Sequence, residues 1–252
     1  CNLSIHNMKN VKTPGHIALL IANIIFGLNN VISRTLAPDI VSPFTLSFLR
    51  MSGAMVLFWI ISLFVKKEHM PPKDIFLLAL ASIFGLVFNQ MPFVVGLSMT
   101  SPIDASMVVT LLPIVSMILA AIFIKEPITM KKALGVLVGA SGALILILNH
   151  PHSDGNSSIK GNLIVLGAVF SYSIYLTMFK GLISRYSPVT LMKWMFLFAT
   201  IFCTPFCYNA VNSTDFASLN PGAYLCISYV VICATFITYF LIPIGPKVLR
   251  PT

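Results

Sequence analysis

The polar side chains that could do chemistry in this chain are few, and most stand inside long apolar runs. Arg50 and Lys193 are cations within such runs, and Asn29, Asn89 and Gln90 are amides within them. A cation or amide among apolar residues is costly unless it lines a wet cavity or meets a polar partner. Arg50 has two interpretations: a cavity residue, or a cation that snorkels or pairs with a backbone carbonyl. For Lys193, whose flexible side chain snorkels easily, the second carries more weight.

Aromatic side chains in the later apolar runs could form the walls of the same site. The candidates are Tyr172, Tyr175, Trp194 and Tyr239. Packing inside the protein, or anchoring at a membrane surface, is the structural alternative for such residues. The sequence alone leaves both interpretations open.

Acid–base catalysis finds little support in this chain. Its seven acidic residues all lie in polar loops or at the ends of apolar runs, so no two carboxylates share a helix face at mid-depth. His150, His152 and Asp154 could suggest a metal site, but a polar loop explains these residues better. We therefore expect no enzyme activity, no cofactor and no metal.

Composition and the length of the apolar runs place the chain in a membrane. Of its 252 residues, 57% are hydrophobic and 9% are charged, which lies outside the range of soluble proteins. About eight runs could cross a bilayer as helices. They lie at residues 15–36, 43–65, 73–98, 102–124, 131–148, 161–182, 188–210 and 222–245. The sequence predicts an all-α, polytopic helical membrane protein.

Four of these runs begin with the same sequence device. A serine or asparagine that can cap a helix is followed by a proline, which suits the first helical turn. The pairs are Ser42-Pro43, Ser101-Pro102, Ser187-Pro188 and Asn220-Pro221. Each pair predicts the N-terminus of a helix.

The net charge of +9 indicates how the chain is oriented in a membrane. The basic residues stand in short turns and form no continuous basic face, so we expect no nucleic-acid partner. They fall in alternate turns, whereas the opposite turns hold Lys160. The alternate set is Lys9, Lys12, Lys66, Lys67, Lys73, Lys125, Lys131, Lys132, Lys180, Arg185, Lys247 and Arg250. The positive-inside rule then predicts a cytoplasmic N-terminus in a multi-pass protein of the inner (cytoplasmic) membrane.

The chain also repeats itself. Ser42-Pro43-Phe44-Thr45-Leu46 recurs as Ser187-Pro188-Val189-Thr190-Leu191. Five spans in each copy, an odd number, would insert the second copy upside down, and the charge pattern independently requires this inversion. The predicted parts are a cytoplasmic segment (1–14), a first repeat (15–148), a polar linker (149–160) and a second repeat (161–252). Because Pro251 aligns with Pro102, we expect a ten-helix design whose last two helices are missing here.

These residues resemble the EamA-type members of the drug/metabolite transporter superfamily. The resemblance is carried by Phe26-Gly27-Leu28-Asn29, by Ser42-Pro43 followed by Arg50, and by the series Thr100-Ser101, Pro113, Glu126, Gly135 and Gly142. It implies ten helices in two inverted five-helix repeats around a central cavity, moving small metabolites and often exporting them. Arg50, Pro113, Glu126 and Gly142 match family positions. The expected lack of the final pair of helices would depart from the family pattern.

Four of these residues have gating or structural interpretations. Pro113 removes an amide within its span and frees the carbonyl of Val109, so it either bends the helix for gating or is only structural. Glu126 lies at a basic turn, where a salt bridge is favoured over an inner gate. Gly135 and Gly142 have the spacing of close helix contacts, either within the repeat or between the protomers of a homodimer.

Together these observations predict a transporter that exports small metabolites, such as amino-acid-like solutes, by alternating access around a central cavity. Its partners would be the lipid bilayer and a small-molecule substrate. The expected substrate pathway consists of Asn29, Arg50, Asn89, Gln90, Tyr172, Tyr175, Lys193 and Trp194. A membrane-embedded enzyme acting on lipid-linked sugars, and a non-transporting receptor or assembly protein, remain alternatives.

Overall fold

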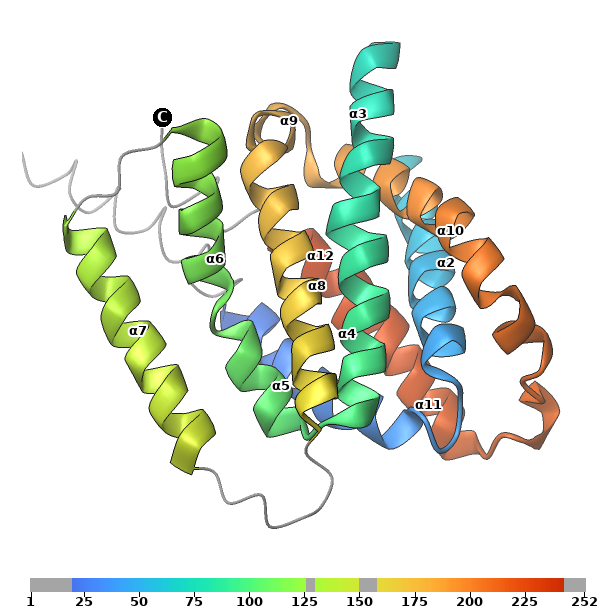
Figure 1. The fold of residues 1–252 in the computed structure, drawn as a ribbon. Coiled ribbons are helices and arrows are strands. Elements are labelled where there is room, and N and C mark those ends of the chain that lie inside the picture. Colours follow the sequence, from blue (N-terminus) through green and yellow to red (C-terminus); the bar gives the residue numbers. More distant parts are fainter. Residues whose placement is uncertain (1–19, 126–129, 150–157, 243–252) are drawn as a thin grey trace, which may run out of the picture.

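A computed structural model describes residues 20–125, 130–149 and 158–242 as a bundle of helices, with no strand among them (Figure 1). Six helical stretches in this part of the chain are long and apolar enough to cross a membrane. They are Pro43–Ser62, Pro72–Met99, Pro102–Ile124, Ile159–Met178, Pro188–Asn212 and Pro221–Leu241, and a shorter apolar helix covers Leu20–Leu36. The prediction of an all-α, polytopic membrane protein is confirmed.

The Ser-Pro and Asn-Pro pairs begin helices as predicted. Helices α2 (Pro43–Ser62), α5 (Pro102–Val109), α10 (Pro188–Asn212) and α11 (Pro221–Tyr229) each start at the proline of such a pair. The preceding side-chain oxygen accepts a hydrogen bond from a backbone amide of the first turn in every case. These caps satisfy amides that would otherwise lack partners at the membrane surface.

Helices from the two halves of the chain pack against each other in pairs. Helix α2 packs along α10, and α4 (Phe88–Met99) packs along α8 (Ile159–Met178). The Leu20–Leu36 helix meets α11 through the Tyr229 hydroxyl, which donates to the carbonyl of Ile25 at 3.2 Å. In Figure 1, α2 and α10 begin at opposite ends of the bundle and run antiparallel. The core is therefore built almost entirely between the two halves.

The contact between α4 and α8 is unusually close because glycines meet there. A Cβ atom added at Gly96 would lie 2.8 Å from the carbonyl oxygen of Gly161, and one added at Gly161 would lie 2.9 Å from the carbonyl oxygen of Gly96. The Thr100 hydroxyl donates to Asn162 Oδ1 at 2.6 Å at the end of the same interface. Glycine is required at both positions because each added Cβ would press on a backbone carbonyl oxygen of the opposite helix, which cannot rotate aside as a side chain can.

Three of the spans contain wider, π-helical turns, at Ile83–Val87, Ala120–Ile124 and Val230–Ile237. In the last of these turns, threonine hydroxyls donate hydrogen bonds to backbone carbonyls. Thr235 donates to the carbonyl oxygen of Val230 at 2.8 Å, and Thr238 donates to that of Cys233 at 3.1 Å. Turns of this kind occur frequently at functional sites because they rotate the following side chains around the helix. Here the wide turn lies where the span passes α2.

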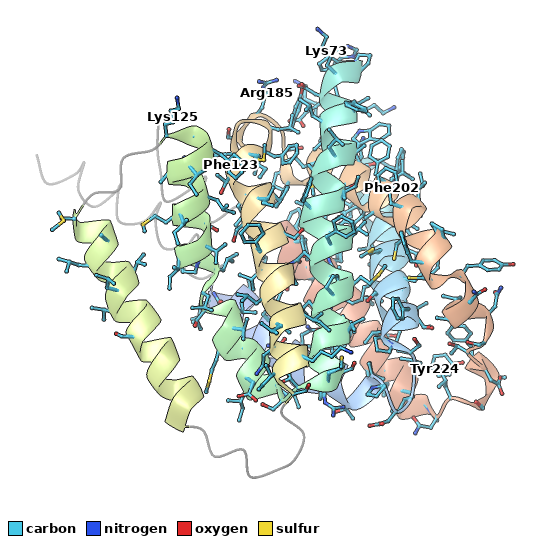
Figure 2. All side chains as sticks on the ribbon, viewed as in Figure 1. Lys73, Phe123, Lys125, Arg185, Phe202 and Tyr224 are labelled. Carbon is cyan, nitrogen blue, oxygen red and sulfur yellow. The ribbon has the colours of Figure 1, made fainter. Side chains whose placement is uncertain are left out.

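The described basic loops gather at one end of the bundle. Figure 2 shows Lys73, Lys125 and Arg185 at this end, which we call the basic end, and Tyr224 at the opposite end. Helix α7 (Met130–Asn149) stands at the edge of the bundle beside α5 and α6 (Leu112–Leu119) (Figure 1). A Cβ at Gly135 or Gly142 would meet nothing within 4 Å, so among the described residues neither glycine makes the close contact predicted within the repeat.

Two apolar cores lie one above the other in the bundle. The core toward the basic end contains Phe58 and Phe196, whose rings stack with centroids 5.5 Å apart. The core toward the opposite end contains Leu46 and Leu97. Arg50, between Leu46 and Met51 on α2, stands at the boundary between the two cores. This boundary is where the candidate site is found.

Candidate functional site

A cavity of about 190 Å³ lies between the two apolar cores. It takes side chains from both halves of the chain, so neither half could form it alone. The residues that line it are Asn23, Phe26, Arg50, Asn89, Gln90, Phe93, Val109, Leu112, Val169, Tyr172, Tyr239 and Ile242. Of the predicted pathway residues, the structure thus brings Arg50, Asn89, Gln90 and Tyr172 together.

Arg50 is the dominant polar group of this cavity. Its side chain is only 2% exposed, and its Nε donates a hydrogen bond to Thr235 Oγ1 at 3.0 Å. Thr235 is available as an acceptor because its own hydroxyl proton goes to the carbonyl of Val230. Within the described part of the chain, neither guanidinium Nη group forms an ion pair with a carboxylate. Among the described residues, the guanidinium is thus held by its Nε edge, and its two outer nitrogens are the atoms that could meet a ligand.

Two amides on α4 extend the polar surface. Asn89 Nδ2 donates to the carbonyl of Ala168 on α8 at 3.1 Å, which leaves Asn89 Oδ1 as an acceptor. The Gln90 amide is buried near the Tyr239 hydroxyl, and neither its oxygen nor its nitrogen forms a hydrogen bond of good geometry with any described residue. Leaving such a group unpaired costs about 1–3 kcal/mol. Gln90 is therefore a group that a bound ligand or water could satisfy.

Aromatic rings form one wall of the cavity. Tyr172 and Tyr239 line it directly, and Tyr239 is held edge-on by Phe196 at 5.4 Å. Tyr175 lies behind Tyr172, with ring centroids 5.6 Å apart, and its ring fills the space above Gly85. Tyr175 thus supports the wall from outside the cavity.

The Pro113 break adds an apolar rim. Helix α5 ends at Val109 and α6 resumes at Leu112, one residue before Pro113. Val109 and Leu112, on either side of the break, both line the cavity. The Thr110 hydroxyl donates to the carbonyl of Met107 at 2.6 Å. The proline therefore bends this span beside the site.

Several predicted site residues lie elsewhere. Asn29 is buried, accepts a hydrogen bond from the Ser33 hydroxyl at 3.1 Å and does not line the cavity. Lys193 and Trp194 line a separate pocket near the basic end, together with Trp59. Glu126 lies outside the described residues, as do His150, His152 and Asp154.

Two residues of the candidate site were not predicted from the sequence. Asn23 lines the cavity from the Leu20–Leu36 helix, and Thr235 holds Arg50. Both are polar residues inside an apolar run, and this is the feature of the sequence by which they could have been identified. That signal is weak, because threonine hydroxyls in such helices also bond within their own helix.

The charge of the cavity is one-sided. Among the residues that the structure places around it, Arg50 is the charged one and none is acidic. No cluster of three or more potential metal ligands occurs within the described ranges. The site offers one cation, amides, phenols and apolar walls, which is a binding chemistry for a small polar solute.

Comparison with known proteins identifies the chain. Residues 13–148 and 159–251 each match the EamA-like transporter family. This chain belongs to that family. The two matched segments correspond closely to the two halves whose helices pair in the structure, and the EamA family assignment makes this protein a membrane transporter.

Relatives of this EamA protein include an uncharacterized transporter of Archaeoglobus fulgidus, 29% identical over 79% of this chain and 67% of the relative. The uncharacterized transporter YetK of Bacillus subtilis is 25% identical over 88% of this chain and 68% of its own length. A WAT1-related protein of Arabidopsis thaliana is 22% identical over 92% of this chain and 75% of its own length. One solved crystal structure shares the fold, with a TM-score of 0.64 at 16% identity over 95% of this chain and 79% of that chain.

Proposed function

We propose that this EamA protein carries small carboxylate-bearing solutes, such as amino acids, across the cell membrane by alternating access. The observation that carries this proposal is the buried Arg50 guanidinium on a cavity whose described lining has no carboxylate. A buried cation without a counter-ion is costly in a membrane protein. A solute carboxylate would supply that counter-ion with the bidentate geometry that arginine favours.

The rest of the cavity supports a small, partly polar solute. The Oδ1 atom of Asn89 can accept a hydrogen bond from an ammonium or hydroxyl group of the solute. The Gln90 amide can accept such a bond through its oxygen or donate one to a solute oxygen through its nitrogen. Tyr172 and Phe93 offer apolar surface for a short side chain. The volume of about 190 Å³ favours metabolites of amino-acid size over larger solutes.

Alternating access is supported by how the halves meet at the two ends. At the basic end, Arg185 pairs with Asp74 at 2.9 Å, and the Tyr186 hydroxyl donates to the same carboxylate. This hydrogen bond raises the pKa of Tyr186, so its hydroxyl stays protonated as a donor. At the other end, the Thr45 and Thr214 hydroxyls lie 3.0 Å apart. We propose that the protein opens by releasing one of these ends at a time.

The antiparallel run of α2 and α10 supports two inverted repeats, and the gathered basic loops support a cytoplasmic basic end. We propose that the N-terminus, which lies outside the described residues, is cytoplasmic and that export is the direction of transport. The exposed outer surface of α7, which includes Leu134, Leu137 and Val138, is the face we would assign to a homodimer contact.

Substrate class is tested by counterflow in proteoliposomes with matched pairs of solutes. Each amino acid is compared with its carboxamide and with the amine that lacks the carboxyl group. We expect the carboxylates to exchange at least about tenfold better, because a charge-assisted hydrogen bond contributes about 1.5–3 kcal/mol. Equal exchange of the amines and the amino acids would show that the protein does not recognise the carboxylate of its substrate.

The closed basic end is tested by Asp74→Asn. Loss of the carboxylate removes the ion pair to Arg185, so the cavity should be reached from that end more often. A cysteine introduced at Val169 should react roughly two- to fivefold faster with an impermeant maleimide added on that side. Asp215→Asn, at the opposite end, is the matched control. Labelling that is unchanged in Asp74→Asn, or equally increased in the control, would argue against this closing contact.

A further inference from the structure

A second pocket, of about 290 Å³, lies at the basic end on the flank formed by α2 and α10. It is separate from the central cavity and shares no residue with it. Its walls come from the end of α2, the loop to α3 (Pro72–Ser82) and the first turns of α10. The lining residues are Trp59, Ser62, Leu63, Lys67, Glu68, His69, Met70, Ile75, Lys193 and Trp194.

Lys193 is held in this pocket by two indole rings. Its Nζ lies 5.5 Å from the ring centroid of Trp59 and 5.9 Å from that of Trp194. The two indoles stand edge to face, with centroids 5.6 Å apart. Ring faces attract a cation and fix its position, but they do not neutralise its charge. No ion pair to Lys193 is found among the residues with described positions.

The acidic residue of the pocket is engaged elsewhere. The Glu68 carboxylate accepts hydrogen bonds from the backbone amide of Ser187 at 3.0 and 3.3 Å, and from the Ser187 hydroxyl at 2.9 Å. Lys67 and His69 line the same pocket on the neighbouring loop. Two lysines against one committed carboxylate leave the pocket net positive. This arrangement selects for an anion.

Apolar surface continues from the pocket toward the middle of the membrane. On α10, the rings of Trp194, Phe198 and Phe202 stack in sequence, with centroids 6.1 and 6.4 Å apart. Figure 2 places Phe202 on α10 farther from the basic end than Arg185. Directly after the end of α2, Leu63 and Phe64 are 73% and 84% exposed beside the pocket. A ligand with both an anionic group and acyl chains fits this combination of surfaces.

We propose that this pocket binds the phosphate group of an anionic phospholipid. The acyl chains of the lipid would lie along the stacked rings of Trp194, Phe198 and Phe202 on α10, which we call the aromatic ladder. Basic pockets between membrane helices are suited to such headgroups, and tryptophan prefers the depth at which headgroups lie. The shared chemistry is a phosphate ester, which a soluble glycerol phosphate also carries. The ladder is the reason for assigning the lipid source. Lys193 thereby has a role apart from the substrate pathway.

Native mass spectrometry of the purified chain in detergent tests this site. The probes are dioctanoyl phosphatidylglycerol, dioctanoyl phosphatidylcholine and sn-glycerol 3-phosphate. We expect phosphatidylglycerol to bind at least about tenfold more tightly than either of the others. Lys193→Gln and Lys67→Gln should each weaken phosphatidylglycerol binding, by about tenfold for Lys193 because a hydrogen bond from a charged group is lost. Lys193→Arg should retain binding.

Lys73→Gln is the matched control, because Lys73 is an exposed lysine of the same end that does not line the pocket. Unchanged binding in both Lys193→Gln and Lys67→Gln, or an equal loss in Lys73→Gln, would overturn the site. Equal binding of phosphatidylcholine would overturn the anion requirement, and equal binding of glycerol phosphate would overturn the lipid assignment. Lys67 is exposed, so its variant tests the site even where Lys193→Gln disturbs packing.

Discussion

Replacing Arg50 by glutamine is expected to abolish transport of carboxylate-bearing solutes and to leave the protein folded in the membrane. The glutamine side chain keeps a hydrogen-bond donor but loses the charge that would face the solute carboxylate. Truncating one partner of a buried charge pair costs about 2–5 kcal/mol, so solute binding should weaken roughly 30-fold or more. Proteoliposome uptake over a range of solute concentrations measures this loss.

Three comparisons separate a role in binding from a role in folding. Arg50→Lys keeps the charge but loses the fork of the guanidinium, so it should retain partial transport. Lys73→Gln removes an exposed cation outside the cavity and should transport normally. Size-exclusion profiles should match among the three variants. Normal uptake by Arg50→Gln would remove Arg50 from the substrate site, and with it the proposed substrate class.

Gly161→Val is expected to be among the most destabilising single changes in the bundle. A Cβ at this position would lie 2.9 Å from the Gly96 carbonyl oxygen and 3.0 Å from the Met99 carbonyl carbon, which belong to the backbone of α4. Because a backbone cannot rotate aside as a side chain can, α4 and α8 must separate. Overpacking of this kind costs about 3 kcal/mol or more at the severe end. Thermal unfolding in detergent, followed by fluorescence-detected size exclusion, measures the cost.

The matched control is Gly167→Val on the same helix, where an added Cβ meets nothing within 4 Å. It should cost much less, since only the propensity of a β-branched residue changes. The same interface carries the hydrogen bond from Asn89 to Ala168, so Gly161→Val should also impair transport in the protein that survives. Equal melting temperatures for the two variants would show that this helix contact tolerates spacing changes.

Much of the fold was readable from the sequence because a bilayer imposes a one-dimensional constraint. Each span must satisfy its own backbone hydrogen bonds, so a long uncharged run can only be a helix. The pairs Ser42-Pro43 and Ser187-Pro188 set helix starts through local capping, which depends on few residues. Basic turns were likewise sufficient to predict that Lys73, Lys125 and Arg185 share one end.

The residues that line the cavity could be predicted only in part from the sequence. Arg50, Asn89, Gln90 and Tyr172 were predicted and do line it, because a polar residue deep in a span needs a polar environment. Asn29 is equally buried but lies outside the cavity: its Oδ1 accepts a hydrogen bond from Ser33, and its Nδ2 has no hydrogen-bond partner among the described residues. A polar residue within a span is thus recognisable from the sequence as one whose burial costs free energy. The sequence does not show whether a cavity or a neighbouring side chain reduces that cost.

The tertiary structure decided which polar residues meet. A span that is apolar on all sides carries no periodicity to show which face is turned inward, and each residue advances the helix by about 100°. The wide turn at Val230–Ile237 changes that rotation again and brings Thr235 to Arg50 across 185 positions of the chain. Lys193 was displaced from the predicted pathway by its indole neighbours, one of which, Trp59, comes from the other half. Contacts of such separation depend on how the helices pack, and no local pattern encodes them.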